Sequence, residues 1–318
     1  MLTLSAAAVH RLLPIRECIE VMADSFRALA RDRVVQPLRT TLRVPDGSGA
    51  LFLMPAWVGE PAALGVKILT VYPDNPSLGL EALQGVVLFF EPEKGTPLAA
   101  IDAAAVTGIR TAAVSALATR LLAREDAADL AIVGSGVQAR THLESMLAVR
   151  RIRRVRAWSR DRARLERFCS EMTERHGTLV EPAGSAQAAV EGADVVCTVT
   201  ASPEPVLLGE WLRPGAHVNA VGAHTPTTRE LDTTAVLRAR LFVDRREAAL
   251  AEAGEILIPI AEAAIGEDHI AGQLGDVLIG KAVGRRTPDE ITVFKSLGLA
   301  IEDVAAALYL YRRAGGKA

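Results

Sequence analysis

The chain has 318 residues, of which 50% are hydrophobic and 23% are charged, and its formal net charge is −2 at pH 7. This length is sufficient for two domains of ordinary size, each with its own hydrophobic core. The nearly balanced charge gives no electrostatic basis for binding DNA or RNA, so we expect no nucleic-acid partner.

The composition also bears on where the protein works. No apolar run reaches the roughly 18 residues that span a bilayer, and the first residues lack the basic segment and apolar core of a signal peptide. The three cysteines are far apart and form no CxxC pair, which argues against a disulfide framework or a zinc site. The histidines have no metal-ligand spacing. We therefore expect a cytoplasmic protein with no metal site and no membrane contact.

The pattern of the N-terminal third changes at residue 34. Residues 5–32 show helical spacing of apolar side chains, with Ser5 as an N-cap and Pro14 at the start of a second helix. Between residues 34 and 103, short β-rich runs alternate with glycine and proline turns. This region is predicted to form an antiparallel meander.

Strands and helices alternate in the rest of the chain. A helix from Arg110 onward precedes strands at 130–133, 155–158, 194–200, 216–222 and 240–244, with helices at 137–149 and 160–176. The pattern predicts a Rossmann-type, doubly wound parallel sheet with helices on both faces. From Ile291 onward we predict a short strand and a long helix. The basic run from Arg150 to Arg156 is interpreted as a solvated turn.

Gly134, Gly136 and Ala139 form a G-x-G-x-x-A motif between a predicted strand and a predicted helix. The first glycine permits a tight turn, the second lets a pyrophosphate approach the backbone, and the alanine keeps the helix close to the sheet. The helix N-terminus adds N–H groups and a partial positive charge. This context favours a dinucleotide site over an ordinary glycine turn.

The end of the second strand indicates which dinucleotide is bound. An acidic residue there would bind the ribose 2′-hydroxyl, whereas an arginine would favour a 2′-phosphate. Ser159 and Arg160 occupy these positions, and Asp161 comes slightly late for the acidic role. We therefore favour NADP(H) over NAD(H). The alternative is that Arg160 is a solvated cation at the start of a helix.

Three cations precede the glycine motif, namely Arg39, Lys67 and Arg110. Lys67 is a lone charge in an apolar strand, so it either points to solvent or meets an anion, and composition alone favours solvent. Arg110 lies near the predicted junction of two domains, where ligand clefts are common. An arginine can hold a carboxylate with two parallel hydrogen bonds.

Longer stretches carry a more specific signal than the glycine motif. The sequence resembles the ornithine cyclodeaminase/mu-crystallin family over nearly its whole length, in "LGVKILTVYPDNPSLGL", "IDAAAVTGIRTAAVSALATRLLARED", "GSGVQARTHL", "NAVGAHTPTTRELD" and "ITVFKSLGLAIEDVAAA". Members of this family include ornithine and lysine cyclodeaminases, an alanine dehydrogenase, and ketimine or 1-pyrroline-2-carboxylate reductases. Mu-crystallin is a ketimine reductase that also binds thyroid hormone.

The resemblance implies a Rossmann domain flanked by a split α+β domain that binds substrate and forms a homodimer. The expected divisions are a substrate and dimerisation domain at 1–112, a dinucleotide domain at 113–293, and a C-terminal helix at 294–318 that returns to the first domain. A small carboxylated amino or imino acid is the expected substrate.

The resemblance also implies a role for each matching residue. Arg39, Lys67 and Arg110 would surround the substrate carboxylate, and Lys67 would also lie near the reacting Cα–N bond. The implied coenzyme contacts are Thr111, Gly134, Gly136, Val137 and Gln138 at the phosphates, Ser159 and Arg160 at the adenosine ribose, and Thr200, Val221 and Gly222 near the nicotinamide. Lys295 and Ser296 would close the pocket. Glu302 and Asp303 are expected to face water or a neighbouring arginine.

His224 departs from the family pattern, because cyclodeaminases carry an aspartate there. Imidazole can perform acid–base chemistry but lacks the fixed negative charge that would hold a second substrate ammonium. The sequence therefore favours reduction of a small cyclic imino acid, with Lys67 or His224 as the proton donor. The alternatives are ornithine cyclodeaminase, alanine dehydrogenase, and a non-catalytic NADPH-dependent binder of small ligands.

Overall fold

The computed structural model describes residues 1–316. It divides into two compact units, of which unit 1 is Met1–Thr111 with the segment from Gly298 onward, and unit 2 is Ala112–Leu297. The second division falls four residues beyond the predicted residue 293, because the strand that contains Lys295 pairs within the sheet of unit 2. Residues 317–318 of the predicted C-terminal segment lie outside the described residues.

Unit 1 contains a seven-stranded mixed sheet. Its strands are β1 (Leu2–Leu4), β2 (Val34–Val35), β3 (Thr40–Arg43), β4 (Ala50–Gly59), β5 (Ala62–Val71), β6 (Leu83–Phe90) and β7 (Pro97–Asp102). They lie in the order β1-β7-β6-β5-β4-β2, with β3 also paired to β4. The predicted meander is confirmed, since β4 to β7 are joined by antiparallel pairing. The parallel pairing of β1 with β7 was not predicted.

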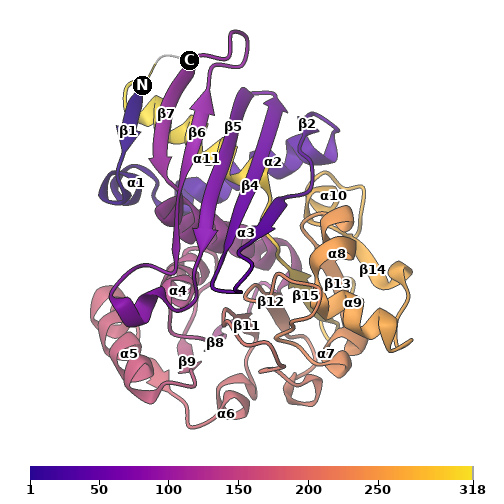
Figure 1. The fold of residues 1–318 in the computed structure, drawn as a ribbon. Helices are drawn as coiled ribbons and strands as arrows, with labels where there is room; N and C mark the ends of the chain where they lie inside the picture. Colours follow the sequence, from indigo (N-terminus) through magenta and orange to yellow (C-terminus); the bar gives the residue numbers. More distant parts are fainter. Residues whose placement is uncertain (317–318) are drawn as a thin grey trace. The chain divides into compact units, whose positions relative to one another are not determined.

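Helices cover one face of this sheet. The helices of unit 1 are α1 (Ala6–Leu12), α2 (Ile15–Ala30), the 3-10 helix η1 (Asn75–Leu78), the first part of α3 (Ala103–Leu122) and α11 (Ala300–Arg313). Figure 1 shows α2 and α11 on the same side of β4 to β7. The predicted helical region 5–32 is confirmed as two helices, and Ser5 accepts a hydrogen bond from Ala8 N at 3.4 Å. Pro14 is the N-cap of α2.

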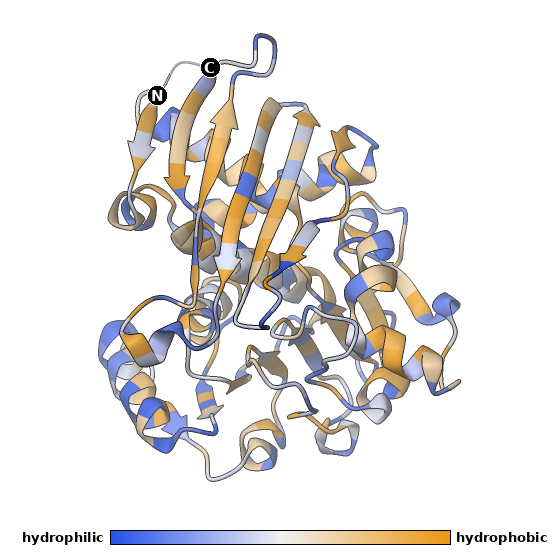
Figure 2. Ribbon diagram, viewed as in Figure 1, coloured by the Kyte–Doolittle hydropathy of each residue, from blue (hydrophilic) through white to orange (hydrophobic). Residues whose placement is uncertain are grey.

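The two faces of the unit 1 sheet differ. Gly65 faces α11, because a Cβ added there would lie 3.1 Å from Val304. Side chains alternate along a strand, so Lys67 on β5 also points toward the helices. The opposite face is largely apolar and half-buried to exposed, and the strands appear largely hydrophobic in Figure 2. We call it the outer face, and its side chains include Leu51, Leu53, Pro55, Trp57, Leu64, Val66, Ile68, Val86, Leu88 and Phe90.

Unit 2 contains the predicted parallel sheet. Its strands are β8 (Asp129–Val133), β9 (Arg154–Trp158), β10 (Val180–Pro182), β11 (Val195–Thr198), β12 (His217–Ala220), β13 (Ala239–Val243), β14 (Ile270–Gln273) and β15 (Ile291–Lys295). All pairings are parallel, in the order β10-β9-β8-β11-β12-β15-β13-β14. The chain runs outward from β8 to β10 and then returns to β11. The switch point between β8 and β11 is where such sheets bind ligands.

The connections of unit 2 are mostly helical. They are α4 (Val137–Val149), α5 (Arg162–His176), α6 (Ala186–Val190), η2 (Gly209–Trp211), α7 (Thr233–Arg238), α8 (Arg246–Glu252), α9 (Gly254–Ala261), η3 (Glu267–His269) and α10 (Leu274–Leu278). The predicted helix 137–149 is confirmed. Among the described residues, no helix is both long enough and apolar enough to cross a membrane.

The interpretation of Arg150 as part of a solvated turn is wrong. Its guanidinium donates to the main-chain oxygens of Thr119 at 2.8 Å, Ala123 at 3.1 Å and Arg124 at 3.0 Å. These carbonyl groups lie in the last turn of α3 and just beyond its end at Leu122. Arg150 therefore caps α3, whereas Arg151 and Arg153 are exposed as predicted.

Candidate active site

Lys67 is buried in unit 1, with 1% of its surface exposed, so the preference for a solvent-facing side chain is wrong. The register of the sheet places it opposite Met54 and Val87. Its Nζ lies 2.6 Å from Asp303 Oδ2 and donates to Thr107 Oγ1 at 3.4 Å. Burying an ammonium is costly unless an anion compensates it, and Asp303 is that anion.

Arg110 completes a buried charge cluster with the start of α11. Its Nε donates to Asp303 Oδ1 at 3.1 Å, and its Nη1 donates to Glu302 Oε2 at 2.6 Å. Both acidic residues are fully buried. Of the two environments expected for Glu302 and Asp303, water and a neighbouring arginine, the structure shows the arginine, which is Arg110. Lys67, Arg110, Glu302 and Asp303 form the charge cluster, in which two cations balance two carboxylates.

Arg39 reaches the same part of unit 1. Its Nη2 donates to the main-chain oxygen of Gly298 at 3.4 Å. Gly298 also contacts Arg110, because a Cβ added to this glycine would lie 2.5 Å from Arg110 Nη1. Gly298 has φ +81°, a conformation that favours glycine. The structure thus brings the three predicted cations together around Gly298 and Asp303.

The charge cluster changes the proton affinity of its members. Burial and, to a lesser extent, the neighbouring positive charge of Arg110 lower the pKa of Lys67 to about 8, against the opposing effect of Asp303 and Glu302. Burial also disfavours the Arg110 cation, but Asp303 and Glu302 outweigh this and raise its pKa. Lys67 can therefore exchange a proton near neutral pH, whereas Arg110 stays charged.

The glycine motif of unit 2 has the geometry that a pyrophosphate requires. Gly134 follows β8 with φ +130°, and a Cβ there would lie 2.8 Å from Val199 O. Gly136 is the N-cap of α4, and a Cβ built on it would meet nothing within 4 Å. The space before α4 is thus open, and first-turn N–H groups of a helix lack acceptors within the helix. These residues fit a dinucleotide phosphate.

The other predicted phosphate contacts lie on helices. Val137 and Gln138 are in the first turn of α4, and Val137 is exposed. Ala139 is fully buried, as close packing of α4 requires. Thr111 lies on α3, where unit 1 ends.

The predicted ribose site follows β9. Ser135 Oγ donates to Ser159 Oγ at 3.0 Å, which joins the turn after β8 to the turn after β9. Asp161 caps α5 by accepting from Arg164 N at 3.0 Å, so its carboxylate already has a structural role. Arg160 is exposed. An exposed cation beside a glycine turn can attract a phosphate.

The predicted nicotinamide contacts lie at the carboxyl ends of β11 and β12. Thr200 and Gly222 both donate to the carboxylate of Glu230. Val221 N donates to Thr198 O at 3.0 Å. His224 is exposed, and its Nδ1 lies 3.3 Å from Gly222 O.

The end of β15 lies beside these loops within the same sheet. Ser296 N donates to Ala220 O at 3.0 Å. Lys295 is buried and donates to Ala223 O at 2.5 Å, and its Nζ forms an ion pair with Glu255 Oε2 at 3.1 Å. Sequence reasoning missed Glu230 and Glu255. Glu255 has the weak signal of an acidic residue directly before the apolar run "ILIPI", whereas Glu230, between Arg229 and Leu231, has no such signal.

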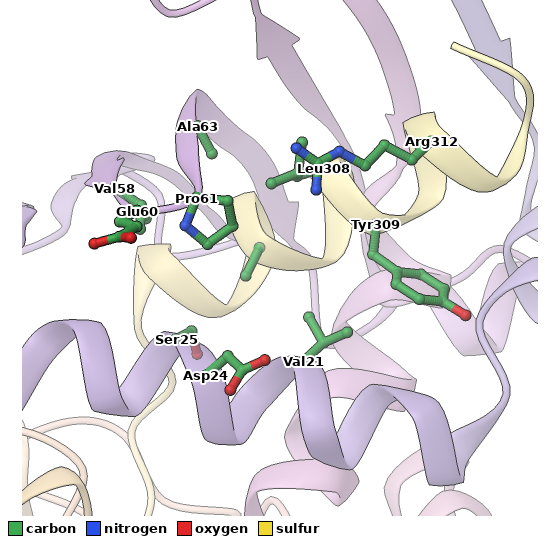
Figure 3. Close-up of a pocket in the computed structure, with 11 residues that line it drawn as sticks. Val21, Asp24, Ser25, Val58, Glu60, Pro61, Ala63, Leu308, Tyr309 and Arg312 are labelled. Atoms are coloured by element: carbon green, nitrogen blue, oxygen red, sulfur yellow. The ribbon is translucent and has the colours of Figure 1, made fainter. Parts of the chain in front are cut away.

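Unit 1 also contains a cavity of about 190 Å³, and no residue of the charge cluster lines it (Figure 3). None of the predicted site residues lines it. The lining comes from α2, α11 and the turn between β4 and β5, namely Val21, Asp24, Ser25, Val58, Glu60, Pro61, Ala63, Ala305, Leu308, Tyr309 and Arg312.

Known proteins resemble this chain over its length. Residues 1–318 match the model of the ornithine cyclodeaminase/mu-crystallin family. The ketimine reductase mu-crystallin of Mus musculus is 42% identical over 278 residues, which cover 87% of this chain and 85% of the mouse protein. A Thermococcus litoralis Delta(1)-pyrroline-2-carboxylate reductase in complex with NADH and L-proline has a TM-score of 0.97 at 37% identity, covering 99% of this chain and 97% of that one.

A further solved structure is an archaeal alanine dehydrogenase dimer with bound NAD. It has a TM-score of 0.93 at 32% identity and covers 99% of this chain and 97% of its own. The whole-length match agrees with the resemblance that the sequence motifs indicated. The chain belongs to the ornithine cyclodeaminase/mu-crystallin family.

Proposed function

We propose that this protein is an NAD(P)H-dependent reductase of a small cyclic imino acid, of the 1-pyrroline-2-carboxylate or ketimine type. The observation that carries the proposal is the charge cluster of unit 1. Replacing a buried ion pair with packed apolar residues is often neutral or stabilising, so stability alone gives little reason for Lys67 in an apolar strand. An amine that exchanges protons near neutral pH, beside two arginines, suits a carboxylated imine. The similarity to a ketimine reductase and to a Delta(1)-pyrroline-2-carboxylate reductase supports this choice of substrate.

The cations divide the work of binding and proton transfer. Arg110 uses Nε and Nη1 for Asp303 and Glu302, and its Nη2 and the guanidinium of Arg39 are suited to the substrate carboxylate. This clamp fixes the ring and favours the anionic substrate over neutral imines. It also holds positive charge next to Lys67, which promotes release of a proton from its Nζ.

Reduction of a C=N bond requires one hydride and one proton. When bound, a reduced nicotinamide supplies the hydride to the imine carbon. Lys67 donates a proton from Nζ to the ring nitrogen, which becomes the secondary amine, and is recharged from solvent. Asp303 favours the ammonium form of Lys67 between turnovers. His224 is the alternative donor, through a water molecule.

Substrate tests distinguish this activity from its rivals. With 1-pyrroline-2-carboxylate, we expect NADPH absorbance to fall steadily as proline forms in equal amount. Ornithine cyclodeaminase would instead convert ornithine to proline and ammonia with no net change in absorbance. Pyruvate with ammonia tests alanine dehydrogenase, and binding without turnover on any of these would indicate a non-catalytic binder. The exposed imidazole at position 224, where cyclodeaminases carry an aspartate, argues against the first rival.

We also propose that NADP(H) is preferred over NAD(H). Arg160 follows β9, a position at which an arginine favours a 2′-phosphate, and Asp161 is already engaged in capping α5. Two of the solved relatives are described with NADH and with NAD, so the comparisons support the coenzyme class and the preference for NADP(H) rests on Arg160 alone.

Unit 1 is proposed to bind the substrate and to form a homodimer, and unit 2 to bind the coenzyme. The outer face of unit 1 supports the dimer, because contiguous exposed apolar surface marks an interface. Trp57 on this face is 39% exposed. The archaeal alanine dehydrogenase is described as a dimer. The three cysteines are free, buried thiols, which suits a reducing compartment, and we propose the cytoplasm as the location.

A further inference from the structure

Glu230 is a fully buried carboxylate that receives four hydrogen bonds. Its Oε1 accepts from Thr200 N at 2.6 Å and from Thr200 Oγ1 at 2.7 Å. Its Oε2 accepts from Gly222 N at 2.6 Å and from Thr198 Oγ1 at 2.9 Å. Each oxygen therefore has two donors, and two of the four donors are main-chain N–H groups.

These four bonds join two neighbouring strands of the parallel sheet at the same end. Thr198 and Thr200 are at the end of β11, and Gly222 follows the adjacent strand β12. The two segments approach so closely that a Cβ on Gly222 would lie 2.0 Å from Thr200 O and 2.7 Å from the Glu230 carboxylate. Only glycine fits between the carboxylate and the end of β11.

A second buried ion pair, between Lys295 and Glu255, fixes Ala223 and holds Glu230 in place. Glu255 Oε1 accepts from Glu230 N at 3.0 Å, and Lys295 pairs with Glu255 and donates to Ala223 O. Main-chain groups of Gly222 and Ala223 are thus bound to two different buried charged side chains. A strand-end loop held in this way has one well-defined conformation.

We propose that Glu230 is a positioning residue for the nicotinamide end of the coenzyme site, acting through Thr200 and Gly222. The inference rests on the proposed function, because that function places a nicotinamide at the carboxyl ends of β11 and β12. Glu230 itself is fully buried, so it would act without contacting coenzyme or substrate. It sets the two loops whose atoms would contact the ring, and the adenosine half of the site, after β8 and β9, does not depend on it.

The test is Glu230→Gln, which keeps the size of the side chain but turns one acceptor oxygen into an NH₂ group that faces two donors. Asp194→Asn is the matched control. Asp194 is also a buried carboxylate that accepts from two main-chain N–H groups, of Ala128 at 2.8 Å and Asp129 at 3.1 Å. It precedes β11 at the opposite end of the same sheet. Asp194 therefore also binds main-chain N–H groups of a strand end, but it lies far from the proposed nicotinamide end of the strands.

Binding of two ligands to the free protein separates positioning from stability. The first ligand is NADPH, which contains the nicotinamide, and the second is 2′-phospho-ADP-ribose, which lacks it. If the protein prefers NAD, NADH and ADP-ribose replace them. We expect Glu230→Gln to weaken NADPH binding by about tenfold while changing binding of the fragment by less than about twofold. Asp194→Asn should lower the melting temperature and leave the ratio of the two affinities unchanged.

Equal weakening of both ligands by Glu230→Gln, or the same change of ratio in Asp194→Asn, would overturn the proposal. If Glu230→Gln does not fold, Thr198→Val is the second variant, because it removes one buried donor to Glu230. It should weaken NADPH binding by roughly threefold without weakening binding of the fragment. Equal effects on the two ligands would also overturn the proposal. A protein that binds NADPH but does not reduce the imine would refute the proposed reaction and leave this inference standing. Binding of neither coenzyme would refute both.

Discussion

At the scale of single residues, the partner of a charge decides what the charge can do. The sequence identified Lys67 as an unusual cation, but composition favoured solvent for it. Its partner Asp303 is distant in the sequence, and only folding brings the two within 2.6 Å. The cations of the candidate site could therefore be predicted from motifs. Their carboxylate partners could not, because an acidic pair in a helix is usually solvated.

The pH dependence of turnover tests the role of Lys67. Its pKa of about 8 means that the protonated donor is present below pH 8 and is lost as the pH rises through that value. We expect kcat for imine reduction to fall above about pH 8. Lys67→Met should reduce kcat by about 100-fold or more and remove this pH dependence, with NADPH binding unchanged. Lys94→Met, which alters an exposed lysine of unit 1, is the control, and an unaltered pH profile in Lys67→Met would exclude Lys67 as the donor.

Arg160 tests the coenzyme preference. Arg160→Asp removes the cation proposed to bind the 2′-phosphate and places a carboxylate near the ribose hydroxyls. We expect the ratio of kcat/KM for NADPH to that for NADH to fall by about tenfold or more. The neighbouring Arg162, which pairs with Glu166 at 2.7 Å, provides the control Arg162→Asp. An unchanged ratio in Arg160→Asp would mean that the arginine is only a solvated cation.

At the scale of elements, local patterns predicted strands and helices well, but pairing partners poorly. The meander and the alternating strands and helices followed from periodicity and turn residues. The insertion of β15 between β12 and β13, and the pairing of β1 with β7, join segments that are far apart in the chain. The role of Arg150 was missed for the same reason, since the carbonyl groups that it caps lie at the end of α3, in an earlier part of the chain.

Helix α11 combines a structural and a functional role in its first turn. Glu302 accepts from Leu299 N at 2.9 Å and thereby caps the helix, while Asp303 binds both cations of the charge cluster. Asp303→Asn leaves buried positive charge without its partner, so we expect the free energy of unfolding at pH 7 to fall by about 3 kcal/mol in denaturant titrations. Asp24→Asn, which breaks an exposed pair with Arg27, should cost less than about 0.5 kcal/mol. Similar losses in both variants would contradict the assigned burial.

At the scale of the whole molecule, the outer face of unit 1 is an apolar surface that nothing in a single chain covers among the described residues. Val66 lies at its centre, between Pro55 on β4 and Leu88 on β6. We expect Val66→Glu to convert a dimer into a folded monomer, measured by analytical ultracentrifugation, because a charge in an apolar interface is strongly unfavourable. Leu179→Glu alters an apolar side chain that is 63% exposed in unit 2 and should leave the mass unchanged. A Val66→Glu variant that remains dimeric would place the interface elsewhere.

Binding of a carboxylated imine by Arg39, Lys67 and Arg110 is the central claim about this protein. The most direct measurement is a comparison of kcat/KM for 1-pyrroline-2-carboxylate and for 1-pyrroline, which has the same ring and the same C=N bond but no carboxylate. Two charge-assisted contacts predict a preference of about 100-fold or more for the carboxylated ring. Equal rates for the two rings, or a preference for 1-pyrroline, would show that these cations do not bind the substrate carboxylate.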